Sequence, residues 1–96
     1  MRIVYLGSAA TDLVWFRTYY DRVFPDGAAN AREAVRRMET LLRDNPHVGR
    51  RTHRPDVRRL RILRTPFFVI YRPTAERIET LRVIDSRSFD GMVFDE

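Results

Sequence analysis

Cysteine is absent from this 96-residue chain, so neither a disulfide nor a thiolate zinc site can form. A chain without cysteine suits a reducing compartment, and we expect a cytoplasmic protein. The longest apolar runs, such as FFVIY, fall far short of the roughly 20 residues of a membrane span. The N-terminus also lacks the long apolar region of a signal peptide. We therefore expect no association with a membrane.

Groups that bind metals or phosphates are also scarce. The two histidines, His47 and His53, share one loop with scattered carboxylates, and the four glycines are isolated from one another. A zinc site needs convergent ligands, and a phosphate-binding loop needs clustered glycines. We therefore expect neither a metal ion nor a cofactor.

Lysine is missing as well, because all 18 basic residues are arginine; with 13 acidic residues the formal net charge is +5. The arginines are unevenly placed. Residues 50–64 hold seven arginines and one acidic residue, whereas the last seven residues, DGMVFDE, hold three acids and no base. This asymmetry predicts a positive patch that faces an acidic partner, either nucleic acid or an acidic protein.

The length fits one domain spanning residues 1–96. Two segments, 9–23 and 28–43, repeat apolar residues at helical spacing on either side of a Pro-Asp-Gly break, which predicts an antiparallel helical hairpin. Ser8 is a candidate N-cap for the first of these helices. The remaining expected elements are a strand at 2–6, a loop at 44–56, and strands at 57–63, 67–72 and 78–84.

The first strand after the loop alternates, with Leu60 and Ile62 on one face and Arg59 and Arg61 on the other. Three consecutive strands predict an antiparallel meander, and the helical hairpin must cover one face of it to bury its apolar side. The expected fold class is α+β: an N-terminal strand, an antiparallel helical hairpin and a three-stranded antiparallel meander with the helices on one face. Leu60, Ile62 and Val69 should contact the helices, and the arginines should line the other face.

Five segments, in this order and spacing, resemble the RelE/ParE superfamily of toxins from bacterial type II toxin–antitoxin systems. They are ATDLVWFRTYY, LLRDNPHVGRR, DVRRLRI, PFFVIYRP and IETLRVIDSR. The resemblance covers about residues 1–88. It implies a small toxin that is neutralised by an acidic antitoxin from the same operon and that contacts operator DNA only through this antitoxin.

The superfamily divides into RelE-like ribonucleases, which cut messenger RNA on the ribosome, and ParE-like members, which are described as poisons of DNA gyrase. A metal-independent ribonuclease needs a proton donor and acceptor together with cations for the phosphorane charge. Asp85 stands where the family commonly has histidine, and an ionised carboxylate there would repel phosphate. The resemblance therefore favours a ParE-like gyrase inhibitor without catalytic residues.

Two alternatives stay open at this point. A ribonuclease would draw on Arg59, Arg61, Arg87, His47 and His53. An inactive or regulatory member would act only as an antitoxin-binding module.

Expected contacts with the antitoxin or the target combine arginines and aromatic residues. Trp15, Phe16, Tyr19 and Tyr20 are expected mainly in the core and helix packing, with Trp15 or Tyr19 lining an antitoxin groove. Arg72 is expected to form an ion pair with Glu79 or Asp85. The full set of expected binding residues is Arg58, Arg59, Arg61, Arg64, Trp15, Tyr19, Phe68 and Arg87.

Overall fold

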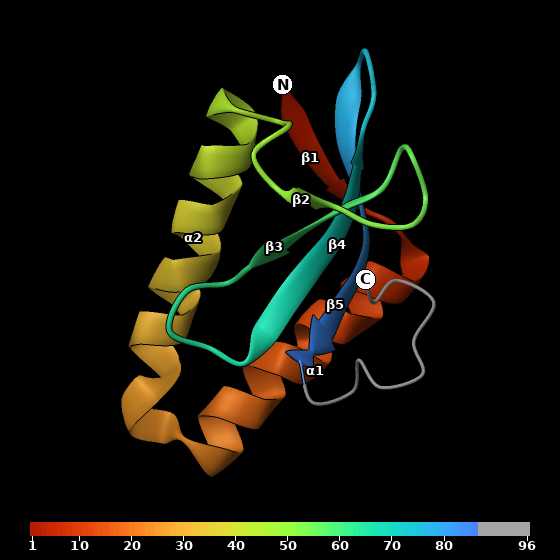
Figure 1. Cartoon of the computed structure of the whole chain (residues 1–96). Helices are drawn as coiled ribbons and strands as arrows, with labels where there is room; N and C mark the ends of the chain where they lie inside the picture. The colour runs from red at the N-terminus through yellow and green to blue at the C-terminus, as the bar shows by residue number, and fades with distance from the viewer. Residues whose placement is uncertain (87–96) are drawn as a thin grey trace.

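A computed structural model describes residues 1–86 of the chain (Figure 1). It has an α+β fold in which two helices follow an N-terminal strand and precede the rest of the sheet, as the sequence predicts. A single 3-10 turn at Pro25–Gly27 separates the helices. The elements are β1 (Arg2–Tyr5), α1 (Gly7–Val23), α2 (Ala28–Asp44), β2 (Arg50–Arg51), β3 (Arg58–Arg61), β4 (Phe67–Pro73) and β5 (Arg77–Asp85).

The sheet has five strands in the order β1-β5-β4-β3-β2. Strands β3, β4 and β5 form the predicted antiparallel meander, whereas β1 runs parallel to β5 and makes the sheet mixed. The two-residue strand β2 extends the sheet beyond β3. The expected loop 44–56 therefore contains this short edge strand, and the expected strand 57–63 is shorter, ending at Arg61.

The main core lies between the sheet and the two helices. Phe16 of α1 and Leu42 of α2 pack into one cluster with Ile62 and Val69, all of them buried, and the half-buried Leu60 packs against it. This confirms the prediction that Leu60, Ile62 and Val69 face the helices. Phe16 is almost fully buried, but Trp15 is 55% exposed, so the expectation of a core role for Trp15 is wrong.

A second apolar cluster lies on the other face of the sheet, which the sequence predicted to be charged. Val57, Ile70 and Ile84 are buried there, with Phe68 and Leu81 packed against them. Their register explains the placement: Phe68 is opposite Ile84, and alternate residues of a strand share a face. The arginines of this face therefore lie beside apolar side chains.

The expected N-cap at Ser8 is wrong. Helix α1 begins at Gly7 with Leu6 in the N-cap position, and the Leu6 side chain forms no capping hydrogen bond. The carbonyl of Leu6 accepts the first helical hydrogen bond, from the N–H of Ala10, while its own N–H donates to Thr80 of β5. Leu6 thus joins the end of β1 directly to the helix.

Gly49 occupies a position where only glycine fits. Its N–H donates to the Tyr71 hydroxyl at 2.9 Å, and a Cβ would lie 2.6 Å from that oxygen and 2.7 Å from the carbonyl oxygen of Arg59. Because the obstacles are a buried ring and backbone, we expect Gly49→Ala to lower the free energy of unfolding by about 1–3 kcal/mol.

Denaturant titration, with unfolding monitored by circular dichroism, would measure this loss. Gly7→Ala is the matched control, since nothing lies within 4 Å of its added methyl group in the first turn of α1. The control should retain or gain stability. A Gly49→Ala variant as stable as the wild type would contradict this packing.

Candidate functional site

Two arginines of β3 flank one aromatic ring on the face of the sheet away from the helices. Arg61 is opposite Phe68 and Arg59 is opposite Ile70. The guanidinium carbons of Arg59 and Arg61 lie 5.5 and 5.4 Å from the centroid of the Phe68 ring. This distance allows cation–π attraction, which restrains both side chains without neutralising their charge. The three residues are called the arginine face below.

The expected binding arginines at 58 and 64 lie elsewhere. Arg58 is on the opposite side of β3 from Arg59, where its guanidinium donates to the carbonyls of His47 and Gly49 at 3.1 and 2.9 Å. It therefore holds the loop after α2 against the sheet. Arg64 lies in the turn between β3 and β4, outside both strands.

Asp85, the position where the family commonly has histidine, does not lie on the arginine face. Asp85 is opposite Phe67, whose ring faces the helices, so its carboxylate is on the other side of the sheet from Arg59 and Arg61. Burial, the nearby Tyr19 hydroxyl and the Asp85 carboxylate raise the pKa of Tyr20 on that side.

The remaining ribonuclease candidates lie in loops or outside the described residues. His47 and His53 are both exposed, in the loop between α2 and β3. Arg87 lies outside the described residues, as does the acidic end of the sequence. The expected catalytic set therefore stays a prediction.

A buried carboxylate, that of Glu79, binds two arginines on the face of the sheet away from the helices. Arg72 donates to one oxygen of Glu79 at 2.9 and 2.7 Å, and Arg77 donates to the other at 2.9 and 2.6 Å. This confirms the predicted ion pair between Arg72 and Glu79. The hydrogen bonds from Arg72 and then Arg77 hold the pKa of the Glu79 carboxyl below its ordinary value.

This depressed pKa predicts a stability that falls in acid. A carboxyl with a lowered folded-state pKa stabilises the fold above the pH where it ionises in the unfolded chain, about 4.3, and loses this contribution as the pH falls through its folded-state pKa. Thermal melts between pH 3 and 7 should show a flatter acid limb for Glu79→Gln than for the wild type. Glu76→Gln, at an exposed residue with no ion pair among residues 1–86, should keep the wild-type slope. Parallel curves for Glu79→Gln and the wild type would refute the assignment.

A second ion pair, which the sequence did not reveal, joins α1 to β5. The Asp12 carboxylate accepts from Arg82 Nε at 2.7 Å and from the backbone N–H of Val83 at 2.9 Å. Strand β1 pairs with β5 only as far as Thr80. Beyond that point the Asp12 carboxylate accepts a hydrogen bond from a backbone N–H at the edge of β5. Asp12 thus has a structural role here, and its neighbour Leu13 packs against the main core.

A partly exposed aromatic cluster lies along α1 and at its C-terminal end. Trp15 stacks on Tyr19 with ring centroids 5.4 Å apart, and Tyr19 contacts Phe24 at 5.9 Å. Trp15 also lies 5.9 Å from the buried ring of Phe67. The cluster is therefore supported from beneath while it remains open to a partner, which is the arrangement expected of apolar contact residues.

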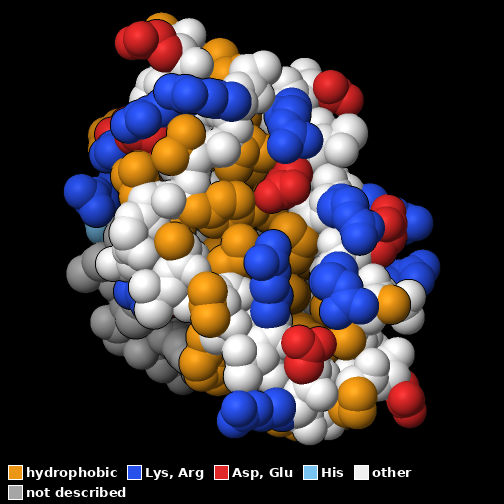
Figure 2. Space-filling view, turned by 180° about the vertical axis from the view of Figure 1, so that it is seen from behind, with side chains coloured by type: hydrophobic (Ala, Val, Ile, Leu, Met, Phe, Trp, Pro, Cys, Tyr) orange, Lys and Arg blue, Asp and Glu red, His pale blue; other side chains and the backbone are white. Residues whose placement is uncertain are grey.

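The helices carry balanced charge. Figure 2 shows the side opposite to that of Figure 1, where basic and acidic side chains mix around a band of hydrophobic ones. On α2, Arg32 pairs with Asp21, and Arg36 and Arg37 both pair with Glu33. The arginine face differs because its two guanidinium groups lie over an aromatic ring.

Two further properties concern ions and membranes. Among residues 1–86, no three side chains of His, Asp or Glu form a group able to hold a metal ion. Neither helix in the described part of the chain has the length and apolar character needed to cross a bilayer.

Comparison with known proteins identifies the family. Residues 3–88 match the model of the family described as ParE toxin of type II toxin-antitoxin system, parDE. A solved structure of the chromosomal ParDE toxin–antitoxin system from P. aeruginosa is similar at a TM-score of 0.70 and 27% sequence identity, covering 88% of this chain and 95% of that one. No curated protein matches the sequence. The favoured ParE-like branch is confirmed: the chain belongs to the ParE toxin family of type II toxin–antitoxin systems.

Proposed function

We propose that this ParE-family toxin arrests growth in the cytoplasm by binding and inhibiting DNA gyrase, and that a cognate acidic antitoxin neutralises it. The observation that carries the proposal is the family match over residues 3–88, since ParE-like toxins are described as gyrase poisons. Inhibition by binding requires a surface and no proton relay. The arginine face supplies such a surface, with Arg59 and Arg61 over Phe68.

Contact through arginine suits either an acidic surface of the gyrase or its bound DNA. A guanidinium group forms bidentate hydrogen bonds with carboxylates and with phosphates, and it stacks on aromatic rings. Because Phe68 restrains both side chains, less conformational entropy is lost when they bind. The exposed Trp15, stacked on the half-buried Tyr19, adds apolar area on α1.

Neutralisation follows from the same charges. An antitoxin with an acidic segment would be attracted to the arginines of the hairpin that β3 and β4 form. This attraction should make association fast and salt-sensitive. Covering Arg59 and Arg61 would remove the toxin's contact with its target. Operator DNA would be bound by the antitoxin and not by this chain.

Expression in bacterial cells tests the proposal. Induction of the toxin should stop growth and switch on a DNA-damage reporter, while messenger RNA mapped by primer extension stays uncut. Co-expression of the protein encoded beside the toxin gene should restore growth. The folded double variant His47→Ala with His53→Ala should stay toxic. Cut messenger RNA, or loss of toxicity in this variant, would instead support a ribonuclease, and a folded but harmless wild type would support an inactive member.

A further inference from the structure

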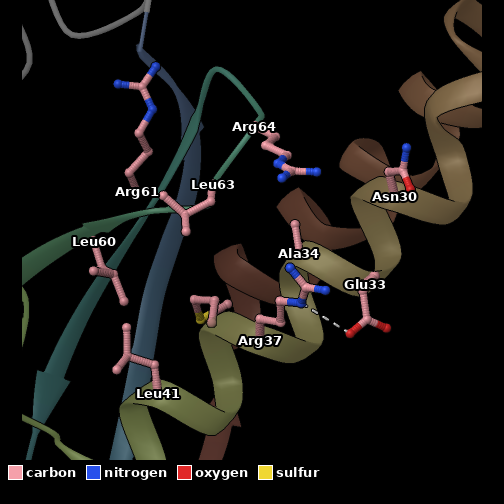
Figure 3. Close-up of a pocket in the computed structure, with 10 residues that line it drawn as sticks. Asn30, Glu33, Ala34, Arg37, Leu41, Leu60, Arg61, Leu63 and Arg64 are labelled. Atoms are coloured by element: carbon pink, nitrogen blue, oxygen red, sulfur yellow. Dashed lines mark ion pairs between the residues drawn. The ribbon is translucent and has the colours of Figure 1, made fainter.

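An apolar groove lies between α2 and the hairpin of β3 and β4. It has a volume of about 230 Å³. In Figure 3, Leu41 and Leu60 point toward one another across it, and Leu63 lies between the hairpin and α2. Leu63 is 66% exposed and Leu41 is 41% exposed, although both are large aliphatic residues. The apolar residues that line this α2–β3 groove are Ala34, Met38, Leu41, Leu60 and Leu63.

The size and chemistry of the groove favour part of a protein over a small ligand. Pockets for small molecules usually measure about 300–1,000 Å³, so this groove suits one or two apolar side chains of a bound peptide. Its apolar lining is aliphatic, and nucleobases are bound mainly by stacking on aromatic rings. The occupant that fits is a protein segment with an aliphatic or aromatic residue.

Arg64, at the rim, indicates the charge of this segment. It is the second central residue of a turn that the N–H of Thr65 closes onto the carbonyl of Ile62, and it has a φ of 65°. This left-handed conformation ordinarily selects glycine or asparagine. Its side chain extends toward α2 (Figure 3), and it has no ion pair or hydrogen bond with any other residue of 1–86. A strained turn that presents an unpaired guanidinium beside an apolar groove is suited to binding a carboxylate.

The groove also opens at a part of the β3 edge with which no other strand of residues 1–86 pairs. Strand β2 pairs only with Arg58 and Arg59, so it does not cover the rest of β3. The N–H of Ile62 donates inward to Phe67, and neighbouring residues of an antiparallel strand direct their N–H groups to opposite sides. The N–H of Arg61 therefore points outward at this edge, where an extended segment can pair with it.

From these observations we infer that the α2–β3 groove binds an extended acidic segment of the antitoxin. The segment inserts an apolar side chain between Leu41 and Leu63, places a carboxylate against Arg64, and pairs its backbone with the edge of β3. This inference rests on the proposed neutralisation by an antitoxin and adds the place where it occurs. Because Arg61 belongs both to this edge and to the arginine face, the bound segment also covers the surface proposed to contact gyrase.

Two variants test the groove with the protein encoded beside the toxin gene as the probe. Leu63→Glu places a negative charge in the groove at an exposed position. Arg64→Gly removes the cation and the backbone strain that the positive φ causes. Each should weaken binding at least about tenfold in calorimetry. Arg64→Gly should melt no lower than the wild type. A lower melting temperature would instead indicate that this arginine has a structural role. Val48→Glu, at another exposed apolar residue, is the control and should bind within about twofold of the wild type.

Hydrogen exchange followed by NMR supplies an independent readout, because the amide of Arg61 should become protected when the antitoxin binds. Wild-type affinity in both folded groove variants, or an unprotected Arg61 amide, would overturn the inference while leaving neutralisation intact. Failure of the wild type to bind the probe would overturn the proposed neutralisation itself. Weakened binding of a single-stranded RNA 20-mer by the two variants, with antitoxin binding unchanged, would assign the groove to nucleic acid and overturn the inference.

Discussion

Replacing Phe16 with alanine is expected to lower the free energy of unfolding by about 3–5 kcal/mol, the cost of a deleted core aromatic ring. The Phe16 ring is 1% exposed and packs edge-on against Phe67 with centroids 4.9 Å apart. Its loss would leave a cavity where α1 meets the sheet. A domain of this size is stable by roughly 5–14 kcal/mol, so the variant should be marginally folded or unfolded at 37 °C.

Urea denaturation with extrapolation to water would measure this loss. Val14→Ala on the same helix is the matched control, because Val14 is 62% exposed and its truncation should change stability by less than about 0.5 kcal/mol. A loss below about 1 kcal/mol for Phe16→Ala would mean that α1 does not pack on the sheet in this way.

Removal of both arginine side chains from the arginine face should abolish toxicity. The double variant Arg59→Ala with Arg61→Ala deletes the two guanidinium groups over Phe68, and neither group belongs to the main core. The loss of cation–π contacts should cost stability only about 0.5–1 kcal/mol for each arginine. Colony counts after induction should therefore rise to those of an empty vector while circular dichroism shows a folded protein.

The control for this variant removes the same charge from the helical side. Arg32→Ala with Arg36→Ala deletes two exposed arginines of α2 that pair with Asp21 and Glu33. If net charge alone determined toxicity, both double variants would be equally harmless. If the control stays toxic and the β3 variant does not, position on the arginine face decides the activity. A folded β3 variant that still arrests growth would refute the role of this face.

Sequence periodicity was sufficient where each element buries a continuous apolar stripe. The predicted helix 28–43 ends one residue before the observed α2, Ala28–Asp44, and the predicted strand 67–72 agrees closely with β4, Phe67–Pro73. These elements are specified by local patterns of buried residues. Alternation along the predicted strand 57–63 likewise placed Leu60 and Ile62 toward the helices.

Features that depend on distant parts of the chain were not predictable. Asp12 and Arg82 are separated by 70 positions, and their pairing follows from the parallel alignment of β1 with β5, which no local pattern encodes. Strand β2 has two arginines and no apolar residue, so it produces no periodic signal. The second apolar cluster was missed because Val57 precedes β3 and Ile70 belongs to β4, and both lie beside arginines that indicated a solvated face.

The candidate site was foreseen in part. Alternation in the sequence placed Arg59 and Arg61 on one face, but it could not show that both would lie over Phe68. Arg58 was expected to bind a partner together with these two arginines, but its guanidinium group donates to carbonyls of the loop after α2. The left-handed conformation of Arg64 was also hidden, because a Leu-Arg-Thr-Pro sequence carries no glycine or asparagine to mark such a turn.

The central claim is that this ParE-family chain acts by binding gyrase through its arginine face. The most direct test is a supercoiling assay with purified gyrase and relaxed plasmid DNA. The account predicts that the wild type inhibits supercoiling in a concentration-dependent way, that prior mixing with the antitoxin prevents this, and that Arg59→Ala with Arg61→Ala does not inhibit. Gyrase that supercoils normally in the presence of excess folded toxin would contradict the account.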